Sequence, residues 1–363
     1  MFVPAMPSAA ADLRVTPDAI QLSLTLYLAA MAAGQLIAGP LSDAFGRRPA
    51  IIASASLFVL GSIVAWAATD LVALLGGRIL QALGGASGLV ASRAMAGDKA
   101  GSRATRDVAL LMAVVMLSPM LAPILGAGLA SSLGWHSIFA LLAAAGIVLG
   151  GMAILFLPET RSASSEKLGL GAMAGQWRRL LADRRFLRNL AIGCSLTAGL
   201  YIFLTGSPFL FLGLGVAQGD LGLCFALVAA AMAIGAISAG WLAGRVRPLL
   251  LVRVSACAIA AATILFAILA LIGEAGAVAL LATMAIYALG GGLIAPNAMS
   301  GAMAAGDGRP GLAVSAYGSI QMASNTAAAA FAIALPSGSI VAFSLALVAT
   351  ATCAAILAAS RSS

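Results

Sequence analysis

The chain has 363 residues, of which 62% are hydrophobic and only 9% charged, and its formal net charge is +8. Soluble domains carry about 25% charged residues, and no soluble core of this size could bury so much apolar surface. We therefore exclude a soluble enzyme, and also a disordered chain, because disorder requires low hydrophobicity. The composition predicts a polytopic membrane protein.

Eleven runs are long and apolar enough to cross a bilayer, which takes about 20 residues each. Barrel strands would be shorter and would alternate apolar with polar residues, so these runs predict helices and an all-α fold. The shorter apolar segment 1–7 is predicted to be the end of a further helix whose beginning is absent. In chain order the full spans cover 19–42, 49–69, 71–92, two spans within 108–158, 189–219, 221–244, 254–273, 275–306 and two spans within 310–360.

The basic residues predict the orientation of the chain. Eighteen of the 20 lysine and arginine residues fall on alternate loops and on the C-terminal tail; the exceptions are Arg14 and Arg78. Cytoplasmic loops carry the excess of positive charge, so the loops after the odd-numbered full spans and the C-terminus are predicted to be cytoplasmic. The positive net charge is therefore interpreted as a topology signal with anionic lipid as its partner, and not as a nucleic-acid signal.

The polar stretch in the middle of the chain divides it into two halves. We predict an N-terminal helix bundle over 1–160, a cytoplasmic linker over 161–186 and a C-terminal helix bundle over 187–363. Two weak internal similarities support a duplication. Ala-Leu-Gly-Gly at 82–85 recurs at 288–291, and the segment 39–49 resembles 240–248. Parallel repeats with a site between them are one way in which secondary transporters are built.

The residues suited to bond-making chemistry are few. The chain has one histidine and four cysteines, and each cysteine stands alone within an apolar stretch. This spacing predicts neither a metal site nor a disulfide framework. We expect no cofactor, no metal and no enzymatic activity.

The most specific motif is the loop between the first two full spans. It contains Gly39, Asp43, Gly46, Arg47 and Arg48. It resembles the signature loop G-x-L-[SA]-D-R-x-G-R-[RK] of the major facilitator superfamily, although Ala44 stands where that family usually has a basic residue. The resemblance implies a cytoplasmic gating latch; the alternative is an ordinary positive-inside anchor.

Arg78 is the one charge predicted to lie inside a span, where an ionisable side chain is costly and indicates function. Gln81 follows one turn later on the same helical face. The segment resembles the R-x-x-Q-G-x-G motif of drug:proton antiporters, with Ala82 in place of a glycine, and this implies a role in proton coupling. The alternative is an arginine that snorkels to the membrane interface.

The next expected span, near 108–131, contains Pro123 and Gly126. These residues resemble part of the Gly-Pro-x-x-Gly-Gly element of antiporters, and the alternative is a helix-packing face. The segment 157–160, Leu-Pro-Glu-Thr, resembles the end of helix six in the superfamily, and we interpret it as helix-terminating.

Further matches at Gln35, at 134–139, at 205–209 and at 296–297 resemble the bicyclomycin-resistance branch, which usually has arginine where this chain has His136. The resemblance implies two six-helix bundles in a bacterial inner membrane and proton-driven efflux of small amphipathic drugs by a monomer. The alternatives are a dedicated metabolite exporter or importer of the same fold, or an uncoupled scaffold protein.

A polar stripe predicts the wall of a substrate cavity. Tyr317, Gln321 and Asn325 are spaced four residues apart and therefore share one helical face. The alternative for each residue is hydrogen bonding between helices. The further candidates for the cavity are Tyr27, Tyr201, Phe203 and Asn297, together with Gln35.

The resemblance also implies that proton coupling uses a carboxylate. In the bicyclomycin-resistance branch, helix one ends with an aspartate directly before the segment that matches 1–7. The acidic residues of this sequence fall outside the interior of the predicted spans, and arginine does not deprotonate in proteins. We expect either that an upstream segment supplies the acid or that this form has lost normal coupling.

Overall fold

The structure is a computed structural model. It describes residues 1–97, 122, 124–159, 177–242, 245–304, 310–336 and 338–360. Within these ranges the regular elements are helices, which agrees with the predicted all-α class. The predicted linker lies mostly outside the described residues, as does most of the span expected near 108–131.

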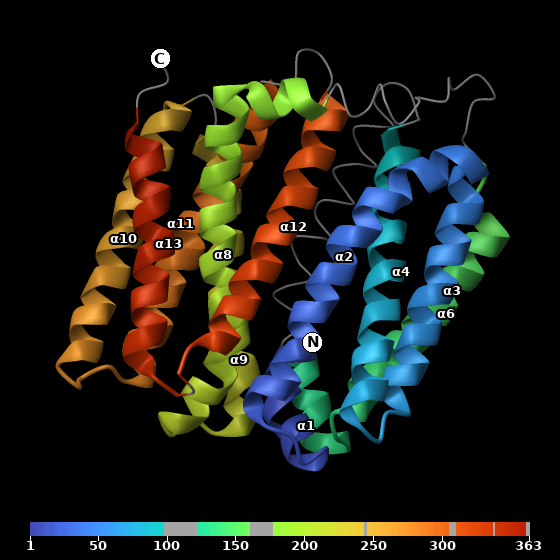
Figure 1. The fold of residues 1–363 in the computed structure, drawn as a ribbon, viewed down its shortest axis with the longest axis horizontal. Coiled ribbons are helices and arrows are strands. Elements are labelled where there is room, and N and C mark those ends of the chain that lie inside the picture. Colours follow the sequence, from blue (N-terminus) through green and yellow to red (C-terminus); the bar gives the residue numbers. More distant parts are fainter. Residues whose placement is uncertain are drawn as a thin grey trace.

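The first half of the described chain forms four long helices preceded by a short helical segment (Figure 1). The second half forms six long helices and one short turn of 3-10 helix. The elements of the first half are η1 (Val3–Ala5), α1 (Met6–Asp12), α2 (Pro17–Phe45), α3 (Arg47–Trp66), α4 (Leu71–Gly97) and α6 (His136–Phe156). Those of the second half are α8 (Arg184–Gly213), η2 (Gln218–Asp220), α9 (Leu221–Leu242), α10 (Pro248–Leu271), α11 (Ala277–Ala304), α12 (Pro310–Ala334) and α13 (Ile340–Ala359).

Nine of the described helices are long and apolar enough to cross a membrane by length and composition. They include α2, α3, α4 and α6 from the first half and α13 at the end of the chain. The helix α12, which carries the predicted polar stripe, has 25 residues, so it is also long enough to cross about 30 Å of hydrocarbon. The described chain is therefore a multi-pass membrane protein.

The helices begin where side chains satisfy the first backbone N–H groups. Thr16 accepts a hydrogen bond from Ala19 N at the start of α2, and Asp183 accepts one from Phe186 N at the start of α8. The cap at Asp183 explains why α8 begins before the apolar run predicted from 189 onward. Its first turn carries arginines and extends the helix beyond the apolar span.

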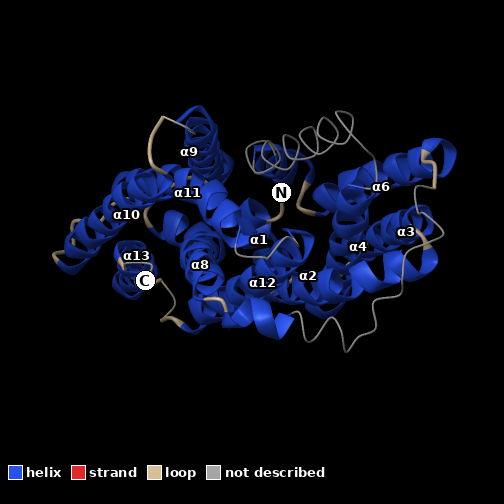
Figure 2. Cartoon of the chain, turned by 90° about the horizontal axis from the view of Figure 1, so that it is seen from above, coloured by secondary structure: helices blue, strands red, loops and turns tan. Residues whose placement is uncertain are grey.

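The helices of the two halves gather on opposite sides of the molecule (Figures 1 and 2). They meet along α2 and α12, where Ala329 belongs to the same buried cluster as Leu24 and Leu28. The N-terminal segment also lies between the halves, because Phe2 packs in this cluster while Val3 packs against the core of the second half. We call the end of the molecule with the start of α2 the lower end and the opposite end the upper end, as they stand in Figure 1.

Glycines bring α3 and α4 into close contact. A Cβ added at Gly77 would lie 2.6 Å from the backbone nitrogen of Ala65 and 2.8 Å from the carbonyl oxygen of Gly61. Real Cβ atoms do not approach backbone atoms so closely, so the spacing of the two helices requires glycine at this position. The neighbouring Gly76 has nothing within 4 Å of its added Cβ.

We expect Gly77→Ala to lower the free energy of unfolding by about 1–3 kcal/mol, because the added methyl overpacks the contact between α3 and α4. Gly76→Ala is the matched control, and it should be neutral or slightly stabilising because alanine favours helix. Thermal unfolding of the purified protein in detergent measures both effects. Equal melting temperatures for the two variants would contradict this account of the packing.

Candidate functional site

A buried arginine occupies the interior of the first half. Arg78 on α4 is 8% exposed, so its side chain is enclosed by the protein. Its guanidinium carbon lies 3.9 Å from the centre of the Tyr27 ring and about 6 Å from the rings of Phe2 and Phe139. A cation over an aromatic face is stabilised by the ring quadrupole, most strongly where water is excluded. The aromatic residues therefore offset part of the cost of burying this charge.

A chain of hydrogen bonds fixes one end of the guanidinium. Arg78 Nη1 donates to Gln81 Oε1 at 2.6 Å, and Gln81 Nε2 donates to Ser62 Oγ at 2.8 Å. The Ser62 hydroxyl donates in turn to the carbonyl oxygen of Phe58. The chain links α4 to α3 and sets the orientation of the Gln81 amide. Arg78 Nε finds no hydrogen-bond partner in the part of the chain that the structure describes.

The predicted stripe on α12 faces the second half and the interface between the halves. Tyr317 is 2% exposed, and its hydroxyl packs so closely against Gly193 of α8 that no Cβ would fit there. Asn325 is 1% exposed, and its Oδ1 has no partner among the described residues. A buried amide oxygen without a partner is costly.

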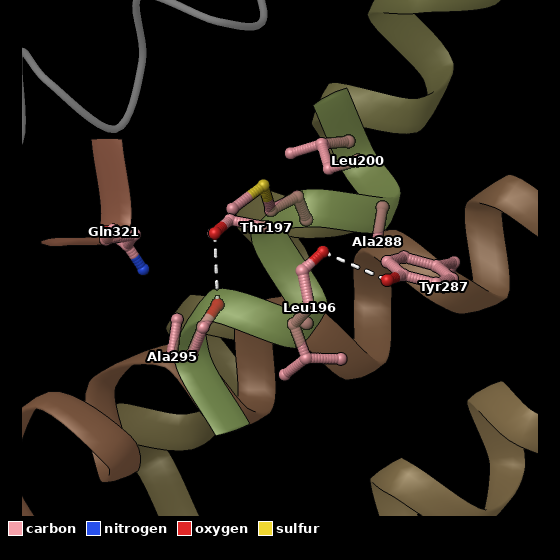
Figure 3. Close-up of a pocket in the computed structure, with 10 residues that line it drawn as sticks. Leu196, Thr197, Leu200, Tyr287, Ala288, Ala295 and Gln321 are labelled. Carbon is pink, nitrogen blue, oxygen red and sulfur yellow. Dashed lines mark hydrogen bonds between the residues drawn. The ribbon is translucent and has the colours of Figure 1, made fainter. Parts of the chain in front are cut away.

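A small cavity of about 30 Å³ lies between α8, α9, α11 and α12. In Figure 3 the amide of Gln321 approaches it from α12, while Leu196 and Tyr287 lie on the other side, joined by a 3.0 Å hydrogen bond from the tyrosine hydroxyl to the leucine carbonyl. Drug-sized ligands occupy pockets of roughly 300–1,000 Å³, whereas this cavity has room for one or two water molecules. It must enlarge before it can hold a drug. Its lining consists of Gly193, Leu196, Thr197, Leu200, Met232, Tyr287, Ala288, Gly291, Ala295 and Gln321.

Other predicted cavity residues lie elsewhere. Tyr201 packs on the cluster shared by the two halves, as does Tyr27. Phe203 is fully buried against Phe211 and Phe225 inside the second half, and Asn297 donates to the carbonyl oxygen of Leu293 in its own helix. The structure therefore does not gather all the predicted residues around one cavity.

Gln35 lies at the contact between the halves, because its Oε1 is 3.5 Å from the position of a Cβ added at Gly318 of α12. In the predicted antiporter helix, Gly126 packs against the backbone of Met1 with no space for a side chain. Pro123 falls outside the described residues.

The predicted gating loop is a sharp turn at the upper end. Gly46, with φ of 98°, separates α2 from α3. Arg47 Nη1 donates to Ser42 Oγ, and Arg48 Nη2 donates to the carbonyl oxygen of Ile154 at the end of α6. The side chain of Asp43 and the surroundings of Gly39 lie outside what the structure describes, so the role of Asp43 in a latch stays a prediction.

Glu159 contributes to this loop in a way that the sequence pattern did not predict. Its two carboxylate oxygens accept hydrogen bonds from Arg47 N at 3.0 Å and Arg48 N at 3.2 Å, which are the first backbone donors of α3. Carboxylates stabilise helix N-termini by this contact and by the helix dipole. A Cβ at Gly46 would lie 2.7 Å from Glu159 Oε2. The segment that we interpreted as helix-terminating therefore also caps a helix more than a hundred residues earlier.

We expect Glu159→Ala to lower the free energy of unfolding by about 1–2 kcal/mol, because two backbone donors lose a charged acceptor. Glu274→Ala, which removes an exposed acid between α10 and α11, should change it much less. Thermal unfolding at matched detergent concentration gives the comparison. The interpretation fails if Glu159→Ala is as stable as the unmodified chain.

The described residues contain no group of three or more histidine, cysteine, aspartate or glutamate side chains that could hold a metal ion. His136 Nε2 lies 3.1 Å from the carbonyl oxygen of Ala68, and Trp135 Nε1 donates to Asp12. These contacts tie the start of α6 to the end of α1 and to the loop between α3 and α4 at the lower end. The candidate functional centre therefore consists of the buried Arg78 and the polar face of α12.

Comparison with known proteins places the chain in a transporter family. The model of the Major Facilitator Superfamily matches residues 1–333. The chain is 34% identical over 239 residues to a chloramphenicol resistance protein of Pseudomonas aeruginosa, covering 64% of this chain and 55% of the relative. It is 29% identical over 260 residues to the uncharacterized MFS-type transporter YdgK of Bacillus subtilis (strain 168), covering 70% of this chain and 65% of that protein.

A third relative is the multidrug resistance protein MdtL of Salmonella heidelberg (strain SL476), which is 28% identical over 257 residues. The match covers 70% of this chain and 65% of the relative. The chain thus spans less than two thirds of the length of these relatives. The family match extends over most of the chain, however, and it agrees with the helical membrane fold. The chain therefore belongs to the major facilitator superfamily, a family of transporters and not of enzymes.

Proposed function

We propose that this protein exports small amphipathic drugs across the bacterial inner membrane by alternating access, in exchange for protons. The observation that carries the proposal is the buried centre formed by Arg78, Gln81 and Tyr27. Arg78 is 8% exposed inside a spanning helix, and because burying a charge there is costly, such a residue indicates a role in transport. The names of two relatives, which refer to chloramphenicol resistance and multidrug resistance, support drugs as the substrate class.

Alternating access is supported by the way in which the halves meet. They pack together along α2 and α12, and the cavity beside Gln321 is too small for a drug. Small apolar residues such as Ala329 form this contact and allow the helices to slide or separate without breaking a dense polar network. Separation of the halves at one end and then at the other would expose Gln321 and Asn325 to each side in turn.

The orientation that we propose follows from the basic residues. Arg47, Arg48 and Arg188 lie at the upper end of the molecule, beside the gating loop or the end of α13. The positive-inside rule assigns such an end to the cytoplasm. The lower end, with the start of α2, then faces away from the cytoplasm.

Proton coupling requires a group that titrates inside the membrane, and we propose that a carboxylate beside Arg78 performs this role. The Phe2 ring lies 5.8 Å from the Arg78 guanidinium carbon, so a residue directly before Met1 would lie in the same region. The bicyclomycin-resistance branch that the chain resembles has an aspartate at this position.

Replacement of the buried arginine tests the proposed centre. We expect Arg78→Ala to lower drug efflux roughly tenfold or more, which corresponds to at least about 1.4 kcal/mol of lost stabilisation. Arg245→Ala is the matched control, because Arg245 is exposed and stacks on Trp241 at the edge of the second half. Chloramphenicol accumulation in a hypersensitive host, at matched membrane abundance, is the measurement. Unchanged efflux by Arg78→Ala would reject the proposed centre.

Addition of a carboxylate tests the proposed coupling. We expect that an N-terminal extension ending in aspartate directly before Met1 makes efflux respond to an imposed pH gradient, because the acid then lies near Arg78. The same extension ending in asparagine is the control, since it matches the aspartate in size but does not titrate. Drug uptake into inverted membrane vesicles measures the response. Equal responses from both extensions, or a full response from the unextended chain, would show that the acid is not the coupling group.

A further inference from the structure

An arginine-rich segment crosses the upper end of the molecule directly before α8. Its described residues 177–182 are helical, the chain turns at Asp183, and α8 begins at Arg184. Figure 1 shows this segment, in green, lying across the upper end from the start of α8 toward the start of α12. The spanning helices run between the upper and lower ends in this view, so a segment that lies across their ends runs along the membrane surface.

The depth of the segment follows from contacts at the end of α13. Arg188 Nε donates to the carbonyl oxygen of Leu357 at 2.9 Å, and Arg188 Nη2 donates to that of Ala358 at 3.1 Å. These carbonyls belong to the last turn of α13, whose candidate span ends at Ala359. Residues 177–185 precede Arg188 and continue past this level, so they lie where the hydrocarbon gives way to the lipid headgroups.

One face of the segment packs on three spanning helices. Leu180 is 6% exposed and belongs to a buried cluster. The other members of this cluster include Phe186 of α8, Ala302 of α11 and Tyr317 of α12. Trp177, one turn before Leu180, packs against the same cluster. These two side chains fix the segment to the helix bundle, with its opposite face turned outward.

The outward face is positively charged. Residues 177–188 contain five arginines and one acidic residue, Asp183. The Asp183 carboxylate accepts hydrogen bonds from backbone N–H groups in the first turn of α8, so it serves as a helix cap and cannot neutralise the whole cluster. Four of the five arginines are exposed: Arg178, Arg179, Arg184 and Arg185.

The partner that fits this face is an anionic lipid surface. Four or more basic residues directly beside a spanning helix attract anionic headgroups. Leu181 is 38% exposed next to these charges, and it offers apolar surface that a lipid chain can cover. Tryptophan, as at position 177, is typical of the boundary between headgroups and hydrocarbon. A nucleic acid or an acidic soluble protein would match the charges but not the exposed leucine at this depth.

We propose that residues 177–185 form an interfacial segment that binds the headgroups of anionic phospholipids in the leaflet at the upper end. Because Trp177 and Leu180 join the segment to α8, α11 and α12, the bound lipid restrains the upper ends of these three helices. The binding is independent of the proposed transport activity. Only the assignment of this leaflet to the cytoplasmic side rests on the proposed orientation.

The test uses the full chain in a neutral detergent. Phosphatidylglycerol is the probe, and phosphatidylcholine with the same acyl chains is its counterpart without net charge. We expect phosphatidylglycerol to bind more tightly, and the double variant Arg178→Gln with Arg179→Gln to weaken its binding roughly tenfold, because two favourable charge contacts are lost. Phosphatidylcholine binding should change little. Native mass spectrometry over a lipid titration gives both affinities.

The matched control is the double variant Arg245→Gln with Arg247→Gln. Both residues are exposed and lie in the turn before α10, whose side chain Arg253 also binds the end of α13. This control removes the same net charge at the same end of the molecule, and it should leave phosphatidylglycerol binding nearly unchanged. Leu181→Ser is a second variant that keeps the net charge, and it should weaken the binding of phosphatidylglycerol because the apolar contact is lost.

Three results would overturn the proposal: equal affinities for the two lipids, equal losses in the two double variants, or displacement of phosphatidylglycerol by the same concentration of glycerol 1-phosphate. The second would mean that any basic residue at this end attracts the lipid, and the third that the face binds soluble anions. Melting temperatures establish that each variant is folded. A chain that binds phosphatidylglycerol as expected but exports no drug rejects the proposed function and leaves the lipid surface standing.

Discussion

The burial of one positive charge inside a membrane is the constraint on which the first half of this protein depends. A guanidinium in a low-dielectric interior is costly, and two neutral groups among the described residues each offset part of that cost for Arg78. Gln81 accepts a hydrogen bond from it, and Tyr27 places a ring face 3.9 Å from its carbon. Neither contact carries a full negative charge. The positive charge of Arg78 is therefore well suited to interact with a carboxylate or with another group rich in electrons.

The contact between α3 and α4 makes this arrangement possible. A Cβ at Gly61 would meet the backbone of Gln81, and a Cβ at Gly77 would meet the backbone of Gly61 and Ala65. Because these positions carry no side chain, the helices approach closely enough for Ser62 Oγ to reach Gln81 Nε2. The orientation of the amide that binds Arg78 thus depends on glycines that never touch the arginine.

The pattern of apolar runs was sufficient to predict the helical membrane fold. Each span must be long enough to cross the bilayer, and a helix satisfies its backbone hydrogen bonds within the same segment. The pattern also singled out Arg78, since a charge within such a run is conspicuous. It did not predict that Tyr27 stacks on Arg78 or that Glu159 caps α3, because these contacts join segments that are far apart in the sequence. Phe203 was predicted to line a cavity but is buried in the core of the second half. The sequence alone does not distinguish an aromatic residue that lines a cavity from one that packs in a core.

The helix α2 connects the features that the structure brings together. Near its start, Asp18 and Gln21 line a small cavity at the lower end, and further along Tyr27 stacks on Arg78. Gln35 then lies against Gly318 of α12, and the helix ends at the turn that Glu159 caps. A single helix is stiff over this length, so a tilt that opens the lower cavity also shifts Tyr27 and Gln35.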